Sequence, residues 1–193
     1  MTPSLKIHKE DSGGSHDHEL SALHAGQGVY PITGDITTEL ALETSAYLRY
    51  AAQDGLKVTI PLNSPGGEVN AGLMVYDVIQ SYPHDITIIC VGMAASMGAI
   101  ILAGGRKGRR FILPHSKVMI HEPLIANGFG GSATTIEQKA KTILDVKKNL
   151  NEILAKHTGK TLKEIEKATA FDNYMTAQEA VDFGICDAVS TIY

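Results

Sequence analysis

A run of apolar and mostly β-branched residues, Ile-Thr-Ile-Ile-Cys-Val at 86–91, constrains the fold more than any other segment. A near-continuous run of this kind is typical of a strand that is covered on both faces of a sheet. Such a strand requires helices on each side, and the chain supplies alternating patterns of both kinds. We expect further strands near 29–32, 57–62, 111–113 and 117–121, and helices from 37 or 38 to about 52, at 69–81, up to about 103, and at 135–157, 162–169 and 177–183. The alternation predicts a single α/β domain.

Composition and charge exclude several classes of function. The 193 residues carry 17 Lys and Arg against 21 Asp and Glu, a net charge of −4. This balance argues against a nucleic-acid surface, which needs clustered cations, and we expect the basic cluster at 106–110 to be a solvated loop. No apolar run approaches the roughly 18 residues of a membrane helix, and no secretory signal is visible. We therefore expect a cytoplasmic protein with no nucleic-acid or membrane partner, in which Cys90 and Cys186 are buried thiols.

Residues 1–27 differ from the rest of the chain. They hold few large apolar side chains, the sequence Ser-Gly-Gly-Ser and four of the eight histidines. The segment His-Asp-His-Glu at 16–19 carries side chains that could bind a metal ion, but no rigid scaffold around it is evident. We predict a mobile N-terminal segment over 1–27 and a folded domain over 28–193.

Ser96 lies where a strand is expected to give way to a helix, in Gly-Met-Ala-Ala-Ser-Met-Gly at 92–98. A serine on a tight strand-to-helix turn exposes its hydroxyl to a substrate carbonyl, because its small neighbours leave room. The N–H groups at the start of the helix could stabilise a developing oxyanion. The alternative is that Ser96 is simply the N-cap of this helix, the commoner role for such a serine.

Three further features are ambiguous when taken singly. The sequence Asn-Ser-Pro-Gly-Gly at 63–67 follows an expected strand and is either an ordinary turn or a turn that exposes backbone N–H groups. His121 closes an expected strand, where it could be structural or a rigidly held base. Asp172 precedes an expected helix and could cap it.

Taken together, these segments resemble the proteolytic subunit of the Clp protease. The resemblance covers about residues 28–193. It rests on Asn-Ser-Pro-Gly-Gly at 63–67, Ala-Ala-Ser-Met-Gly-Ala at 94–99, Gly-Arg-Arg-Phe at 108–111, Val-Met-Ile-His at 118–121 and His-Thr-Gly at 157–159. The resemblance implies a serine-peptidase triad in which Ser96 is the nucleophile, His121 the base and Asp172 the acid. It also implies an oxyanion hole formed by the backbone N–H groups of Gly67 and Met97.

The same resemblance implies the fold and the assembly. The fold would be crotonase-like, built of repeated ββα units, with a protruding long helix. The subunits would form heptameric rings, two of them stacked in a tetradecamer, and would work with an ATP-driven Clp-type unfoldase. Peptides or unfolded proteins would be the substrates, and the peptidase subunit would need no cofactor and no metal.

Several positions depart from the family pattern. Residues 1–27 lack the Arg-Gly-Glu-Arg and Asp-Ile-Tyr-Ser-Arg segments that are usual there. Thr59, Pro61 and Ser81 stand where aromatic residues commonly receive the unfoldase. Phe171 stands where an arginine usually precedes the triad aspartate and pairs across the ring–ring contact. The residues for catalysis are thus intact, whereas those of the partner surfaces are altered.

Two alternatives remain open beside a serine endopeptidase. A crotonase-like acyl-CoA enzyme would use oxyanion-binding N–H groups but would need no Ser–His–Asp triad. A non-catalytic ring subunit would assemble with an active paralogue and regulate it, which the altered partner surfaces allow. The complete set of Ser96, His121 and Asp172 favours the endopeptidase.

Overall fold

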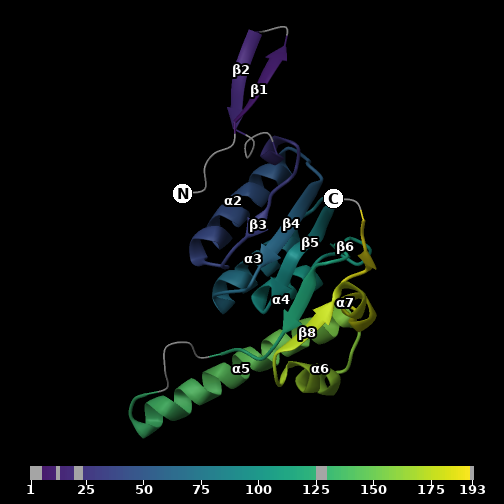
Figure 1. Cartoon of the computed structure of the whole chain (residues 1–193). Helices are drawn as coiled ribbons and strands as arrows, with labels where there is room; N and C mark the ends of the chain where they lie inside the picture. Colours follow the sequence, from purple (N-terminus) through teal and green to yellow (C-terminus); the bar gives the residue numbers. More distant parts are fainter. Residues whose placement is uncertain (1–5, 12–13, 20–23, 125–129, 192–193) are drawn as a thin grey trace.

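A seven-stranded sheet forms the centre of the computed structural model, which describes residues 6–11, 14–19, 24–124 and 130–191 (Figure 1). The strands follow the order β3-β4-β5-β6-β9, and β7 pairs with both β5 and β8. The pairings are parallel except for that of β7 with β8. The strands are β3 (Ile32–Thr33), β4 (Val58–Ser64), β5 (Ile86–Ala95), β6 (Arg110–Ile112), β7 (Lys117–Ile120), β8 (Asn173–Thr176) and β9 (Ala188–Val189). Parallel strands joined through helices confirm the predicted α/β class.

Helices connect the strands and cover the sheet. They are α2 (Thr38–Gln53), α3 (Val69–Ser81), α4 (Met97–Ala103), α5 (Ala133–Thr158), α6 (Leu162–Thr169) and α7 (Ala177–Phe183). Every residue of α4 is buried, as expected of a helix that is apolar on all sides and lies within the core. In the part of the chain that the structure describes, no helix is long and apolar enough to cross a membrane.

Strand β5 is longer than the sequence predicts, and it changes partners along its length. Residues 88–90 pair with β6, whereas residues 93–95 pair with β7. The apolar run predicts a strand that ends at Val91, and that boundary is wrong. Gly92 lies inside the strand with a φ of 94°, and the register with β4 shifts nearby, between Leu62 and Ser64. A glycine at such an irregularity marks a local bend within the strand, so the strand continues to the edge of the site.

The two halves of α5 have different surroundings. Its buried residues are Leu150, Asn151, Ile153 and Leu154, all in the second half. The first half extends away from the sheet and exposes apolar side chains, among them Leu144, which is 62% exposed (Figure 1).

Part of the N-terminal segment has regular structure that the sequence analysis did not assign. Strands β1 (Lys6–Asp11) and β2 (Gly14–Glu19) pair antiparallel in a sheet of their own, which Figure 1 shows apart from the main sheet. Both strands consist mostly of polar residues, so no alternation of apolar and polar side chains marks them in the sequence. The strand pairing does not test the predicted mobility of residues 1–27, which stays a prediction.

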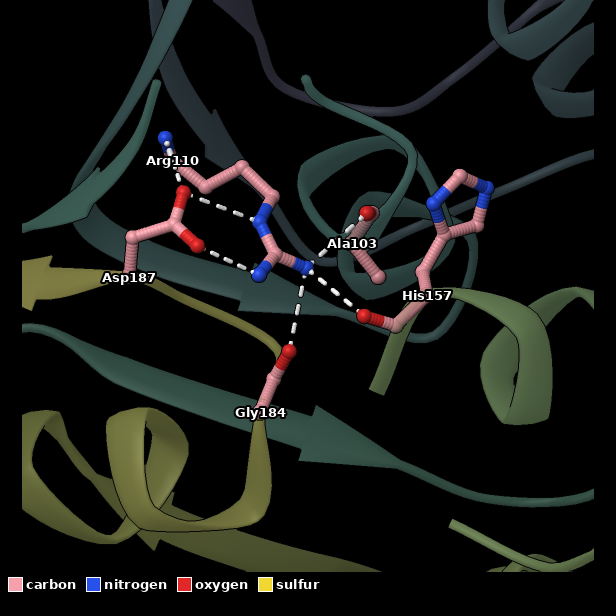
Figure 2. A network of polar contacts seen from close by, with 5 residues as sticks. All are labelled: Ala103, Arg110, His157, Gly184 and Asp187. Carbon is pink, nitrogen blue, oxygen red and sulfur yellow. Dashed lines mark hydrogen bonds and ion pairs between the residues drawn. The ribbon is translucent and has the colours of Figure 1, made fainter. Parts of the chain in front are cut away.

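Arg110 binds the ends of three helices at once (Figure 2). Its Nη1 donates to the carbonyls of Ala103 at 3.3 Å, His157 at 3.2 Å and Gly184 at 3.0 Å, which lie at the C-terminal ends of α4, α5 and α7. Carbonyls at helix C-termini lack partners within the helix, and the helix dipole favours a cation there. The Nε and Nη2 atoms of Arg110 bind the two carboxylate oxygens of Asp187 at 3.1 and 2.5 Å.

This network corrects the prediction that the whole basic cluster at 106–110 is solvated. Arg110 is only 3% exposed, whereas residues 106–109 are exposed as expected. Burial raises the pKa of Asp187, but the hydrogen bonds from Arg110 outweigh this effect and hold the pKa of Asp187 below its ordinary value. The ion pair is therefore a structural element that joins α4, α5 and α7 to β6.

Candidate active site

Ser96 occupies a strained turn between β5 and α4. Its φ of 53° and ψ of −120° lie outside the regions that residues with a side chain normally adopt. Within the described residues, it is the only residue other than glycine with a positive φ. Strain of this kind costs about 1–3 kcal/mol and persists only where the surroundings enforce it, often at functional sites. The turn is the strand-to-helix elbow that the sequence predicts.

The Ser96 side chain contacts a histidine and does not cap α4. Its hydroxyl makes no capping hydrogen bond to the N–H groups at the start of that helix. Instead, Ser96 Oγ lies 2.9 Å from His121 Nε2. Ser96 is therefore the N-cap of α4 by position, but its hydroxyl pairs with His121 and does not cap the helix.

The pairing of β7 with β8 brings His121 and Asp172 together. Ile120 and Asn173, at the ends of these strands, are opposite each other in the antiparallel register. The next residues outward are His121 and Asp172, which therefore meet at the same end of the strand pair. His121 Nδ1 lies 3.1 Å from Asp172 Oδ1. Asp172 is not the cap of α7, because the N-cap of that helix is Thr176.

Ser96, His121 and Asp172 thus form a continuous hydrogen-bonded chain. With the Nδ1–H of His121 directed to the carboxylate, Nε2 is the nitrogen that can accept a proton from the serine. The His121 side chain is 14% exposed, whereas that of Asp172 is 60% exposed. A shielded imidazole in this position can take the hydroxyl proton as the oxygen attacks, and the carboxylate can stabilise the resulting cation.

The loop that follows β4 is held directly against Ser96. The Ser64 hydroxyl donates to the carbonyl of Gly34 at 2.6 Å and accepts from the N–H of Gly66 at 3.1 Å. Gly66 has a φ of 102°, and a Cβ atom at Gly66 would lie 2.7 Å from the Ser96 Cβ. Only a glycine permits both this conformation and this approach. The sequence at 63–67 is therefore more than an ordinary turn.

Gly67, Ser96 and Met97 line the same cavity. The bridge between Gly67 and Ile36 uses the carbonyl of Gly66 and the N–H of Glu68, so it leaves the Gly67 N–H unused. Met97 is the first residue of α4, and the first N–H groups of a helix have no acceptor within it. Both N–H groups are thus available to an oxygen atom bound next to Ser96.

The cavity beside Ser96 has a volume of about 200 Å³. This is less than the roughly 300–1,000 Å³ of pockets that enclose a small-molecule ligand, so it fits one side chain of a longer substrate. Its walls are mainly apolar, and they include Val69, Met97, Ile100, Ile120, Leu150 and Leu154. An extended peptide could therefore place one apolar side chain here while its backbone crosses Ser96.

The described residues offer no other obvious reactive centre. Within them, no group of three His, Cys, Asp or Glu side chains is placed to hold a metal ion. Cys90 and Cys186 are both buried and form no disulfide. Burial raises the pKa of each of these thiols to about 12, so neither is a thiolate at neutral pH.

Asn151 lines the same cavity, although the sequence pattern did not mark it as a site residue. It is 4% exposed and lies in the buried stripe of α5 with Leu150, Ile153 and Leu154. A polar residue at an apolar position of an amphipathic helix was the available signal. The structure shows that the position faces the cavity that Ser96 borders.

An α/β sheet that presents a hydrogen-bonded serine, histidine and aspartate beside an apolar cavity has the geometry of a serine hydrolase site. The model of the Clp protease family, described as Clp protease, matches residues 16–192 of this chain. The chain therefore belongs to the Clp protease family. Membership of this family supports a peptidase function in broad terms.

Proposed function

We propose that this protein is a serine endopeptidase that cleaves peptides or unfolded proteins through an acyl-enzyme. The observation that carries the proposal is the chain of hydrogen bonds from Ser96 through His121 to Asp172. In this mechanism Ser96 Oγ attacks a peptide carbonyl while His121 Nε2 takes its proton. His121 then protonates the leaving amine, and a water activated by the same imidazole releases the acyl group.

Asp172 and the backbone supply the remaining contributions. Asp172 keeps the His121 ring in the orientation that leaves Nε2 free and stabilises its cation. The N–H groups of Gly67 and Met97 donate to the oxyanion of the tetrahedral intermediate. Removing one such donor in other enzymes lowers kcat by about 10²–10³-fold. The hydrogen bonds that fix the loop at 64–68 therefore contribute to the rate, because they position the N–H of Gly67.

The proposal includes assembly into rings that enclose the active sites. Clp protease family members typically form rings and work with Clp ATPases. In this chain, Leu124 is 73% exposed, Phe171 is 85% exposed and Tyr174 is 58% exposed, all close in sequence to His121 or Asp172. Exposed large apolar side chains beside the site fit a surface that other subunits cover.

A Clp-type ATPase is the proposed partner, although the docking positions are atypical. Ser81 is exposed and small, and Pro61 is buried within β4. Buried aromatic anchors commonly carry much of the binding energy at such contacts, and neither residue provides one. We therefore propose a peptidase that engages a conventional ATPase weakly and acts on short peptides or with an atypical partner.

The proposal is tested by hydrolysis of fluorogenic peptides by the full-length chain and by its Ser96→Ala variant. We expect turnover by the natural sequence and none above background by the variant, with unchanged circular dichroism and sedimentation. Acyl-CoA hydrolysis by a protein that leaves peptides intact would favour a crotonase-like enzyme. A folded, assembled protein with neither activity would favour a regulatory ring subunit.

A further inference from the structure

Asn151 places a carboxamide on the wall of the cavity next to Ser96. The side chain comes from the second half of α5, between the apolar neighbours Leu150 and Leu154, and it is 4% exposed. A buried amide without full hydrogen bonding costs stability, so its partners have to be identified. They show which of its atoms is free to bind a substrate.

Only one polar atom of the Asn151 side chain has a hydrogen-bond partner among the described residues. Its Oδ1 accepts a hydrogen bond from Thr169 Oγ1 at 3.3 Å, and Nδ2 has no partner among the described residues. No enclosed side-chain nitrogen or oxygen atom in those residues is left without a partner. Nδ2 is therefore not sealed inside the protein, and the opening that Asn151 borders is the cavity. The amide therefore borders a cavity whose other walls are mainly apolar.

Thr169 allows either orientation of this amide. Its hydroxyl also lies 3.0 Å from the carbonyl of Ile165, one turn back in α6. A hydroxyl has one hydrogen, so donation to Ile165 leaves Thr169 Oγ1 able to accept from the amide of Asn151. In that case Nδ2 turns to Thr169 and Oδ1 turns to the cavity. Asn151 therefore presents either its Nδ2 donor or its Oδ1 acceptor to the cavity. A ligand group that has both a donor and an acceptor can bind either orientation of the amide.

The rest of the cavity wall disfavours a charged ligand group. The lining side chains include no Lys, Arg, Asp or Glu, and His121 is committed to Ser96 and Asp172. A charge placed there would lose its hydration without gaining a counter-ion. An uncharged group that can hydrogen bond is the best match for this environment.

We propose that Asn151 sets the specificity of the cavity for the side chain that precedes the cleaved bond. The cavity takes an apolar side chain, and Asn151 extends its range to an uncharged side chain that ends in a hydrogen-bonding group, glutamine above all. A glutamine stem packs on the apolar walls while its carboxamide donates to or accepts from that of Asn151. This inference rests on the proposed function, and it names a substrate class for the same site.

The test compares peptides that differ only in the residue before the cleaved bond, which is leucine, glutamine or glutamate. We expect the natural sequence to cleave the leucine and glutamine peptides and to reject the glutamate peptide. In Asn151→Leu, the ratio of kcat/KM for glutamine to that for leucine should fall about fivefold, the equivalent of one ordinary hydrogen bond. Thr169 retains its bond to Ile165, so this variant leaves no enclosed hydroxyl unpaired.

Ile100→Val is the matched control, since it trims the same cavity without altering a polar group. We expect the glutamine-to-leucine ratio in this variant to stay within about twofold of that of the natural sequence. Equal ratios in Asn151→Leu and in the natural sequence would overturn the inference. So would an equal fall of the ratio in Ile100→Val.

A binding measurement separates this inference from the proposed function. Fluorescence anisotropy of the same labelled peptides is measured on Ser96→Ala and on Ser96→Ala combined with Asn151→Leu. We expect the second substitution to weaken binding of the glutamine peptide about fivefold relative to the leucine peptide, whether or not the natural sequence turns either over. Absence of turnover with this binding difference intact would count against the proposed function alone. Turnover with no difference in either ratio would count against the role of Asn151 alone.

Discussion

The backbone N–H of Ser96 donates to the carbonyl of Met119 at 2.8 Å, one residue beyond the last paired position of β5. This bond continues the parallel ladder between β5 and β7 into the turn that carries the nucleophile. The distance between Ser96 and His121 is therefore set by strand register and does not depend on a flexible loop. Rigid elements of this kind hold catalytic groups in productive geometry more reliably than loops do.

The strain at Ser96 predicts an effect on stability that is separate from activity. Glycine tolerates a φ of 53° without the steric cost that any Cβ atom imposes there. We expect Ser96→Gly to be more stable than Ser96→Ala by about 1 kcal/mol, which raises Tm by about 2–4 °C for a chain of this size. Thermal unfolding followed by circular dichroism measures the difference. Equal melting temperatures would show that the turn is not strained.

The buried network of Arg110 predicts a large loss of stability. In Arg110→Met, Asp187, whose side chain is only 14% exposed, loses its counter-ion, and three helix ends lose a donor. Breaking one side of a buried ion pair costs about 3–5 kcal/mol, whereas replacing both partners costs less, so Arg110→Met with Asp187→Leu should recover part of the loss. Urea denaturation measures these changes.

Arg109 provides the control for this prediction. It pairs with Asp85 at 3.0 Å, but both side chains are partly exposed, at 46% and 37%. Exposed ion pairs contribute about 0–1 kcal/mol, so Arg109→Met should be nearly neutral. Similar losses in the Arg110 and Arg109 variants would contradict the structural role assigned to Arg110.

His157 predicts a dependence of stability on pH. Burial, with help from the charges of Lys156 and Arg110, lowers the pKa of His157 from its ordinary value of 6.5 to about 4, and Tyr76 Oη lies 2.8 Å from its Nε2. Between these two pH values the unfolded chain binds a proton that the folded chain does not. The free energy of unfolding therefore decreases as pH falls from about 6.5 to about 4.

The matched variant for this effect is His157→Gln, which can keep a hydrogen bond to Tyr76 but does not titrate. We expect its unfolding free energy to decline less between pH 7 and pH 5 than that of the natural sequence. Urea denaturation at the two pH values gives both slopes. Identical slopes would show that His157 stays as easily protonated in the folded protein as in the unfolded one.

Phe171 predicts how the proposed assembly responds to salt. Its side chain is 85% exposed and precedes Asp172, at the position where the family pattern has an arginine. Contacts made through an apolar side chain are not weakened by ionic screening. Sedimentation velocity should therefore show the same assembly at 0.1 M and about 1 M salt, and a smaller species for Phe171→Asp. An assembly that dissociates steadily as salt rises would contradict an apolar contact at this position.

The periodic helices were predictable from sequence, whereas short edge elements were not. The helices α3, α6 and α7 begin and end at the residues that the sequence predicts, and Thr161 and Thr176 cap α6 and α7. The strand β8 was missed because it has four residues and a single buried side chain, Met175, too little for an alternating pattern. Its pairing with β7 nevertheless brings Asp172 to His121.

The candidate site was predictable as a set of residues but not as a geometry. Each of Ser96, His121 and Asp172 alone has an ordinary structural interpretation, and it is the resemblance to the Clp protease family that groups them as a triad. Their contacts span 25 and 51 residues of chain, and such distances depend on strand register, which local propensity does not encode. The roles of Arg110 and Asn151 could not be predicted either, because they depend on the burial of each side chain and on its hydrogen-bond partners in the folded chain.

Covalent labelling directly tests whether Ser96 is an activated nucleophile. The full-length protein is incubated with a fluorophosphonate, and its intact mass and the modified residue are determined by mass spectrometry. We expect one adduct per chain, located on Ser96, and no labelling of Ser96→Ala. Labelling of His121→Ala should be much slower, because the imidazole no longer takes the proton. A folded protein that stays unlabelled, or an adduct on another residue that persists in Ser96→Ala, would contradict the assignment of Ser96 as the nucleophile.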